Sequence, residues 1–342
     1  MQGRVFRRRG KAWAYVVDVG RDAANGRRVQ YTKGGFATRK EAEAALRDTL
    51  GAVERGTHVS RSPATLAEYL QEWLVTVKPR LRPTTWYSYA LAVARMVAVI
   101  GATRLQAVTP LQIERMYAQL LENGGARGQA LAPKTVRNCH TVLHRALSDA
   151  ERLGLVARNA AHAAKGPAVE RKEMATWTAE ELAGFLDFVA GERLYAAYVL
   201  LATTGMRRGE VFGLRWSDVD LDGRRLSVSQ TVTTIGNQVF LGPTKTPRSR
   251  RSVSLDADTV SVLRAHRKRQ AEERMATGLR SAGRLVFGNV DGSALNPDLF
   301  TIAFKRRVKE SGLPELRGPH GLRHTWVISP AHMPLRDMSY VA

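Results

Sequence analysis

The sequence predicts a multidomain protein that begins with a small α+β domain, continues with an all-α bundle and finishes with a mixed, mainly α domain. Three observations predict this fold class. The chain has 342 residues, which is more than one hydrophobic core usually supports. Hydrophobic residues make up 44% of it, as in globular proteins. The apolar spacing changes along the chain from period two, to helical, to a mixture of both.

Residues 1–57 are expected to fold as a three-stranded sheet plus a helix. Alternating side chains predict a strand with its aromatic residues on one face; they are Trp13, Tyr15, Val17 and Val19. Asn25-Gly26 is a typical hairpin turn, so residues 28–32 are expected to form the returning strand. Thr38 and Glu41 have capping-box spacing, which predicts that a helix begins there.

Residues 65–164 are expected to form a four- or five-helix bundle. A second capping box, Thr65 with Glu68, begins this segment, and three later helices are expected to begin at prolines 83, 110 and 133. No strand pattern interrupts the segment. His140 and His144 lie one helical turn apart, a spacing that a metal ion could use. Acidic or thiol partners are missing around them, so we interpret both as helix-face residues and predict no metal and no cofactor.

Residues 175–342 are expected to form the third domain, after a charged linker at residues 165–175. A third capping box, Thr178 with Glu181, begins it. Strand patterns follow at residues 226–232, 238–241 and 252–255, separated by turn sequences. Helical patterns surround these strands, which predicts a mainly α domain with a small sheet.

The charge of the chain indicates its partner. The net charge is +22 and the isoelectric point about 10.8, and such a charge attracts polyanions. A merely basic surface is the alternative. The single cysteine excludes an internal disulfide framework and fits a reducing compartment. Neither a signal peptide nor an 18-residue apolar run is present. We therefore expect a cytoplasmic DNA- or RNA-binding protein, with the nucleoid as its location on DNA and no membrane partner.

Basic residues cluster on the predicted N-terminal sheet; they are Arg7, Arg8, Arg9, Lys11, Arg27 and Arg28. A three-stranded ribbon with a basic face can lie in a DNA groove. A solvated basic face is the alternative, and we favour groove binding.

The third domain carries residues suited to phosphodiester chemistry. Breaking a phosphodiester requires cations that stabilise charge on the non-bridging oxygens and an acid that protonates the leaving oxygen. Arginine forks suit the first task, and lysine or histidine suits the second. The candidates are Arg207, Lys245, His320 and Arg323, the last two one helical turn apart. The sequence has no acidic pair with the spacing of a two-metal nuclease.

Three segments in this order resemble the tyrosine recombinase (phage integrase) family. The first is Thr204-Gly205-Met206-Arg207-Arg208-Gly209-Glu210, and the third is His320-Gly321-Leu322-Arg323-His324. Between them, Lys245-Thr246 with Ser249, Arg251, Val253 and Leu255 resembles the hairpin lysine segment of the family. The order of the domains is also similar: an arm-type DNA-binding domain (1–57), a helical, SAM-like core-binding domain (65–164) and a catalytic domain (175–342).

The resemblance implies a role for each site residue. Arg207 and Arg323 would hold the scissile phosphate, Lys245 would donate a proton to the leaving 5′ oxygen, and His320 would act in proton transfer. Glu210 would organise the loop. Arg248, Arg250 and Arg251 would contact the DNA backbone, although a solvated charge run is the alternative. The implied partners are double-stranded DNA with attachment-type sites, a homotetramer on that DNA and DNA-bending accessory proteins.

The family pattern breaks after Trp326. Family members continue with an amphipathic helix, a histidine or tryptophan and a nucleophilic tyrosine. Here Pro330 and Pro334 cannot lie inside a helix, so the helix is expected to end near Ile328. His332 and Tyr340 come too early for the missing groups. We therefore expect a C-terminally truncated, incomplete catalytic domain without its nucleophile, from a frameshifted or degenerate gene copy.

Four interpretations follow. The first is a site-specific recombinase that, in intact form, exchanges strands through a 3′-phosphotyrosyl intermediate. The second is a catalytically dead DNA-binding regulator or dominant-negative partner of an intact integrase. The third is a remnant whose last domain does not fold. The fourth, a type IB topoisomerase, is disfavoured by the two domains at the front of the chain.

Overall fold

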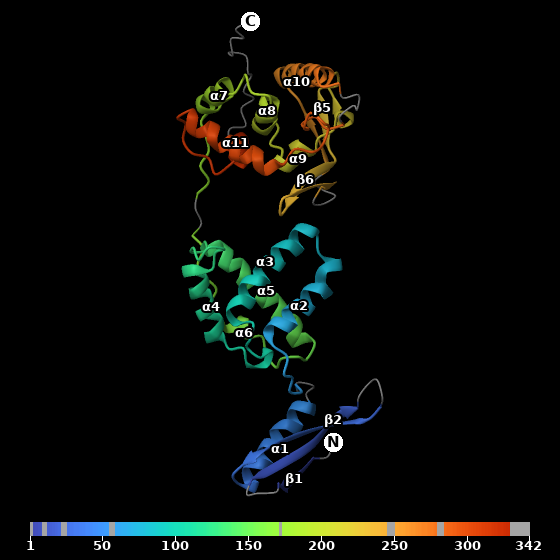
Figure 1. The fold of residues 1–342 in the computed structure, drawn as a ribbon, viewed down its shortest axis with the longest axis vertical. Coiled ribbons are helices and arrows are strands. Elements are labelled where there is room, and N and C mark those ends of the chain that lie inside the picture. The colour runs from blue at the N-terminus through green and yellow to red at the C-terminus, as the bar shows by residue number, and fades with distance from the viewer. Residues whose placement is uncertain are drawn as a thin grey trace. The chain divides into compact units, whose positions relative to one another are not determined.

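The computed structural model describes residues 3–8, 12–21, 26–54, 59–170, 173–244, 250–278 and 284–328. The chain divides into two compact units, residues 1–170 and 171–342. Figure 1 shows the elements of each. The first unit contains a small sheet with a helix and then a helical bundle, and the second mixes helices with short strands.

The N-terminal sheet has three antiparallel strands in the order β1-β2-β3. They are β1 (Gly3–Arg7), β2 (Trp13–Arg21) and β3 (Arg28–Phe36), and helix α1 (Arg39–Glu54) follows. Tyr15 and Val17 of β2 are buried with Leu46 of α1. The Tyr15 hydroxyl lies 2.6 Å from Oγ1 of Thr49. The predicted sheet with one helix is confirmed, and residues 22–25 of its hairpin lie outside the described residues.

The rest of the first unit is a helical bundle, as predicted. Its elements are α2 (Leu66–Val77), η1 (Lys78–Arg80), α3 (Pro83–Ile100), η2 (Leu105–Ala107), α4 (Pro110–Asn123), α5 (Pro133–Arg152) and α6 (Ala160–Ala163). Thr65 and Thr109 both form capping boxes, with Glu68 and Gln112. Proline occupies the first helical position of α3, α4 and α5, where its missing N–H costs nothing.

The second unit contains most of the short strands. Its elements are α7 (Ala179–Phe188), α8 (Tyr195–Thr203), α9 (Arg208–Gly213), η3 (Trp216–Asp218), β4 (Val219–Asp220), β5 (Arg225–Val228), β6 (Gln230–Ile235), β7 (Gln238–Pro243), β8 (Arg251–Ser254), α10 (Ala257–Ala276), α11 (Pro297–Glu310) and α12 (His320–Ile328). Strands β4, β5 and β8 form one sheet, in that order, and β6 and β7 form a separate hairpin.

The strand expected at residues 226–232 is in fact two strands in two sheets, so that prediction is wrong. β5 pairs with β4 and β8, whereas β6 pairs with β7. The break falls at Ser229, whose hydroxyl donates to Asp218 at 3.0 Å and accepts from Arg215 at 2.9 Å. These long-range bonds anchor the chain between the sheets, and no glycine or proline marks the position.

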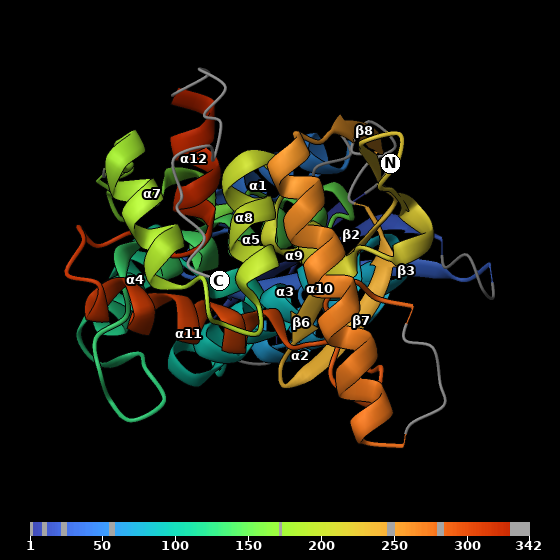
Figure 2. The ribbon, with the colours of Figure 1, turned by 90° about the horizontal axis from the view of Figure 1, so that it is seen from above.

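An aromatic cluster joins the helices of the second unit. Trp177, Phe185, Tyr198, Phe300 and Phe304 are all buried, and their ring centroids lie 4.8–6.3 Å apart. Helix α12 packs on α8 and lies beside α7 and α8 in Figure 2. Within the described residues, no helix has the length and apolar character needed to cross a bilayer.

Candidate functional site

Arg207 lies at the turn between α8 and α9. Gly205 adopts a φ of +59°, a conformation that glycine reaches without strain, and Met206 is fully buried. Arg207 is extended and serves as the N-cap of α9. Its side chain is 52% exposed. The turn is therefore fixed by its neighbours while the guanidinium reaches solvent.

Glu210 is the buried partner of Arg207. Only 4% of its side chain is exposed. One carboxylate oxygen accepts from Nη1 of Arg207 at 2.7 Å, and the other accepts from the Arg207 backbone N–H at 2.9 Å. Nη2 of Arg251, on β8, donates to that second oxygen at 2.9 Å. Burial opposes ionisation, but the bonds from Arg251 and Arg207 hold the pKa of Glu210 below its ordinary value.

Helix α12 carries His320 and Arg323 on one face, since residues three apart are neighbours on a helix. Leu322 and Thr325 are buried and fix the opposite face. Gly321 allows this packing, because a Cβ there would come within 2.9 Å of the buried Leu316 side chain. The next residue of the segment, His324, places its ring 4.7 Å from that of His320 at 89°.

Glu210 of α9 is bonded to Arg251 of β8, and the charges around this pair act on Arg323 and His320 of α12; we call this group the cationic site. Burial, together with Arg207 and Arg251, lowers the pKa of the Arg323 guanidinium, whereas Glu210 opposes this shift. Burial, His324, Arg323 and Arg207 lower the pKa of His320. Nη1 of Arg323 is buried and has no hydrogen-bond partner among the described residues. A buried, unpartnered guanidinium N–H in a cluster of cations is suited to an anion.

Two of the predicted site residues in this unit lie outside the residues that the structure describes. Lys245 and Arg248 lie between β7 and β8, in residues 245–249. Arg250 is exposed, and Arg251 is the first residue of β8. The alternating burial along β8 places Arg251 on the same face as Val253, which is why its side chain meets Glu210.

The sequence predicts one basic cluster on the N-terminal sheet. In the structure, the described basic residues instead lie at two ends of the sheet. Arg7 pairs with Trp13 at one end of β2, and Arg28 pairs with Arg21 at the other. A nine-residue strand separates its ends by on the order of 25 Å. Arg7 and Arg8 are exposed at the first end, and Arg27 and Arg28 at the second; Arg9 and Lys11 lie outside the described residues. Basic residues thus occupy both ends of the sheet.

Three family models match parts of the chain. The phage integrase family model matches residues 176–331, the Arm DNA-binding domain model matches residues 5–53, and the SAM-like N-terminal domain model of phage integrases matches residues 65–121. The integrase of Mycobacterium phage L5 is 30% identical over 276 residues, which cover 79% of this chain and 69% of that protein. The chain belongs to the phage integrase family of tyrosine recombinases.

Other relatives of this integrase span most of its length. The XerC-like tyrosine recombinase of Caldanaerobacter subterraneus subsp. tengcongensis is 26% identical over 95% of this chain and 87% of its own. The Tn1549 transposon integrase, solved with transposon right end DNA, superposes with a TM-score of 0.65 at 19% identity, covering 79% of this chain and 88% of that one. A lambda integrase tetramer bound to a Holliday junction gives 0.57 at 18% identity, over 96% and 91%. These two structures support the fold.

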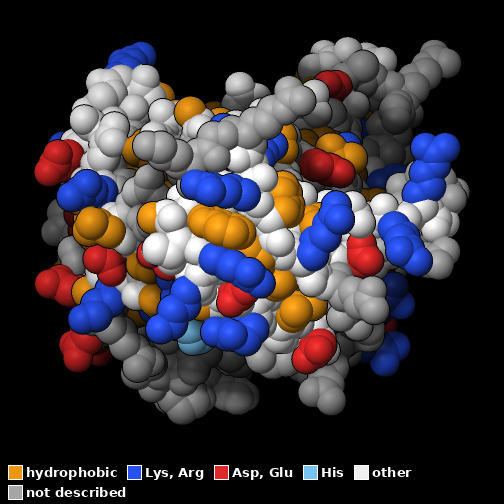
Figure 3. Space-filling model, turned by 90° about the horizontal axis from the view of Figure 1, so that it is seen from below, with side chains coloured by type: hydrophobic (Ala, Val, Ile, Leu, Met, Phe, Trp, Pro, Cys, Tyr) orange, Lys and Arg blue, Asp and Glu red, His pale blue; other side chains and the backbone are white. Residues whose placement is uncertain are grey.

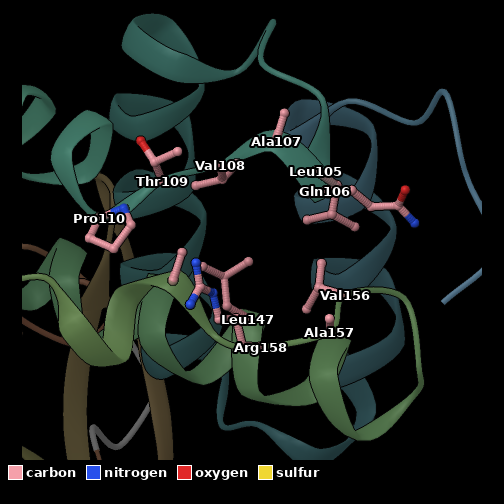
Figure 4. A pocket seen from close by; sticks show the side chains of 11 residues that line it. Leu105, Gln106, Ala107, Val108, Thr109, Pro110, Leu147, Val156, Ala157 and Arg158 are labelled. Carbon is pink, nitrogen blue, oxygen red and sulfur yellow. The ribbon is translucent and has the colours of Figure 1, made fainter. Parts of the chain in front are cut away.

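The helical bundle of the first unit has two further features. In the described residues, no group of three or more His, Cys, Asp or Glu side chains could hold a metal ion. His140 instead lies 2.9 Å from the Tyr117 hydroxyl and next to the ring of His144. A pocket of about 220 Å³ opens in the helical bundle beside η2, with Gln106 and Arg158 in its lining, and Figure 4 shows it. None of the predicted site residues lines it.

Sequence reasoning missed two parts of the site. It assigned Arg251 to the DNA backbone and did not pair it with Glu210. It also gave no role to Thr325, whose hydroxyl oxygen accepts from the Trp177 backbone N–H at 3.1 Å. The alternation of Arg251 with Val253 could have indicated an inward side chain. No sequence signal links residue 177 with residue 325.

Proposed function

We propose that this integrase is a site-specific DNA recombinase that holds one scissile phosphate between Arg207 and Arg323. One observation carries this proposal. Nη1 of Arg323 is buried and unpartnered among the described residues, and the positive charge of Arg207 acts on it. Two guanidinium forks can stabilise the charge that builds on the non-bridging oxygens during in-line attack. Because the forks are already oriented, little reorganisation is needed when DNA binds.

The reaction that this site would support in an intact form, with a nucleophilic tyrosine present, is a transesterification. A tyrosine oxygen forms a bond to phosphorus while the bond from phosphorus to the 5′ oxygen breaks. Lys245 delivers the proton to the leaving oxygen. His320, whose lowered pKa keeps it neutral near pH 7, accepts the proton that the tyrosine hydroxyl loses as it attacks. The 3′-phosphotyrosyl bond stores the energy of the broken linkage, so a second strand can be joined by reversal.

The three segments of the chain divide the binding of DNA. We assign arm-type sites to residues 1–57, core-site binding to residues 65–164 and the phosphate site to residues 175–342. Arg7, Arg8, Arg27 and Arg28 are exposed at the sheet ends and are suited to phosphate contacts. Figure 3 shows one face on which Lys and Arg side chains lie among hydrophobic ones. We further propose a homotetramer on paired attachment-type sites and DNA-bending accessory proteins, since the lambda integrase forms a tetramer on a Holliday junction.

We also infer a second, narrower function for the polypeptide with the printed sequence. Helix α12 is described to Ile328, and the residues after it lie outside the described part. Pro330 and Pro334 cannot lie in the helical continuation that family members use. We therefore infer that Tyr340 is not a nucleophile, and that a polypeptide with no other tyrosine in this site occupies recombination sites without cutting, as a regulator or dominant-negative partner.

One experiment tests both functions. The bound sequence is first enriched from a pool of random duplexes, and a nicked suicide duplex is then built on it. We expect salt-sensitive binding and no covalent adduct on a denaturing gel. An adduct that disappears in Tyr340→Phe would overturn the second function, and equal affinity for every duplex in the pool would contradict site-specific recombination.

A further inference from the structure

We propose that Arg251 is a positioning residue for Arg207, acting through Glu210, and that it is not a contact to the DNA backbone. This inference rests on the proposed function, because Arg207 is the group that would meet the phosphate. It concerns a residue on a different element, β8, that is separated from Arg207 by the whole of β4 to β7.

Burying the charge of Glu210 is costly. A carboxylate with 4% of its side chain exposed requires partners for both of its oxygens. Arg207 supplies one bond to each oxygen. The bond from Arg251 completes the set on the second oxygen. Without Arg251, the carboxylate would keep its desolvation cost and lose a charged partner.

Glu210 also links Arg207 and Arg251 in space. The Glu210 carboxylate joins the N-cap of α9 to the first residue of β8, so it links two elements that are far apart in sequence. Arg207 is half exposed, and its Nη1 is held on the inner side by Glu210. A guanidinium fixed at one nitrogen has its other donors oriented. Arg251 therefore determines where the free edge of Arg207 points.

Two neighbouring arginines differ in their surroundings. Arg250 is exposed, whereas 32% of the Arg251 side chain is exposed and its guanidinium meets a carboxylate. Arg250 directly precedes β8, whereas Arg251 is its first residue. Arg250 is therefore the residue of the pair that suits a DNA phosphate, and it provides a comparator of the same chemistry.

The test is a double-mutant cycle on DNA binding with the full chain and the selected duplex. We expect Arg251→Met to weaken binding by about tenfold and Arg207→Met to weaken it at least as much. The double variant should lose little more than Arg207→Met alone, because both act through one group. In contrast, the fold-losses in affinity from Arg250→Met and Arg207→Met should multiply in their double variant. If the fold-losses in affinity from Arg251→Met and Arg207→Met also multiply in their double variant, the proposal is overturned.

A second readout does not depend on DNA. Glutamate labelled at the carboxyl carbon allows Glu210 to be titrated by NMR, with its signal identified by its loss in Glu210→Gln. We expect Arg251→Met to raise the pKa of Glu210 and Arg225→Met, an exposed arginine paired with Asp220, to leave it in place. An unchanged pKa in Arg251→Met would overturn the proposal.

The two readouts separate this inference from the proposed function. If the chain binds no duplex, the proposed function fails, and the titration alone decides the role of Arg251. If Arg251→Met does not fold, Arg251→Lys replaces it in both measurements. The lysine keeps the cation, so we expect the pKa of Glu210 to stay low, while the lost fork still weakens binding. Unchanged binding in Arg251→Lys would overturn the proposal.

Discussion

The backbone N–H of Trp177 donates to Oγ1 of Thr325 at 3.1 Å, and both groups are buried. The Thr325 hydroxyl in turn donates to the Gly321 carbonyl at 3.2 Å, and the Trp177 indole N–H donates to the Pro314 carbonyl at 2.8 Å. The first residues of the second unit therefore hold the helix that carries His320 and Arg323. The position of α12 depends on this attachment.

We predict that Thr325→Val destabilises residues 171–342 by about 1–3 kcal/mol, because the Trp177 N–H would stay buried without an acceptor. Valine has nearly the same shape as threonine, so packing is preserved. Hydrogen exchange in α12 and urea unfolding would measure the change. Thr325→Ser keeps the hydroxyl and should lie close to wild type; a loss in Thr325→Ser with none in Thr325→Val would mean that the methyl group, not the hydrogen bond, matters.

Acid should destabilise the same unit through Glu210. The folded pKa of this residue is lower than its ordinary value of 4.5, so ionised Glu210 contributes stability above pH 4.5. That contribution is lost as pH falls from 4.5 through the folded pKa. Urea midpoints measured between pH 7 and pH 3 should fall more steeply in wild type than in Glu210→Gln. Parallel curves would contradict the prediction.

DNA binding should strengthen as His320 becomes protonated. The pKa of this histidine is lowered from its ordinary value of 6.5, so the added positive charge appears as pH falls below 6.5. A cation beside the phosphate favours the polyanion. Fluorescence anisotropy between pH 7.5 and pH 5.5 would measure the rise in affinity. His320→Asn should flatten this dependence, and an equally strong rise in affinity in that variant would contradict the prediction.

Arg323→Met should weaken DNA binding and make it less sensitive to salt. Removing one phosphate contact lowers the slope of log affinity against log salt by about 1. Binding isotherms at several salt concentrations would give the slope. Arg306→Met serves as the control, because this exposed arginine of α11 lies 3.8 Å from Glu310. A slope that falls equally in both variants would argue against a phosphate at Arg323.

Local rules identified most of the elements. The capping boxes at Thr65 and Thr178 and the prolines at positions 83, 110 and 133 each mark where a helix begins. These signals depend only on neighbouring residues, so they can be read without tertiary contacts. The division at Ser229 could not be read, because it depends on Arg215 and Asp218.

The sequence by itself determined the family and the order of elements, and it predicted the two site arginines. Arg207 and Arg323 are part of short, contiguous segments whose chemistry is evident from residue type. Only the tertiary structure decided that Arg251 faces Glu210 and that basic residues occupy both ends of the N-terminal sheet. Both facts follow from strand register and from the burial of one carboxylate. Register and burial are properties of the packed chain, because they depend on which distant residues become neighbours.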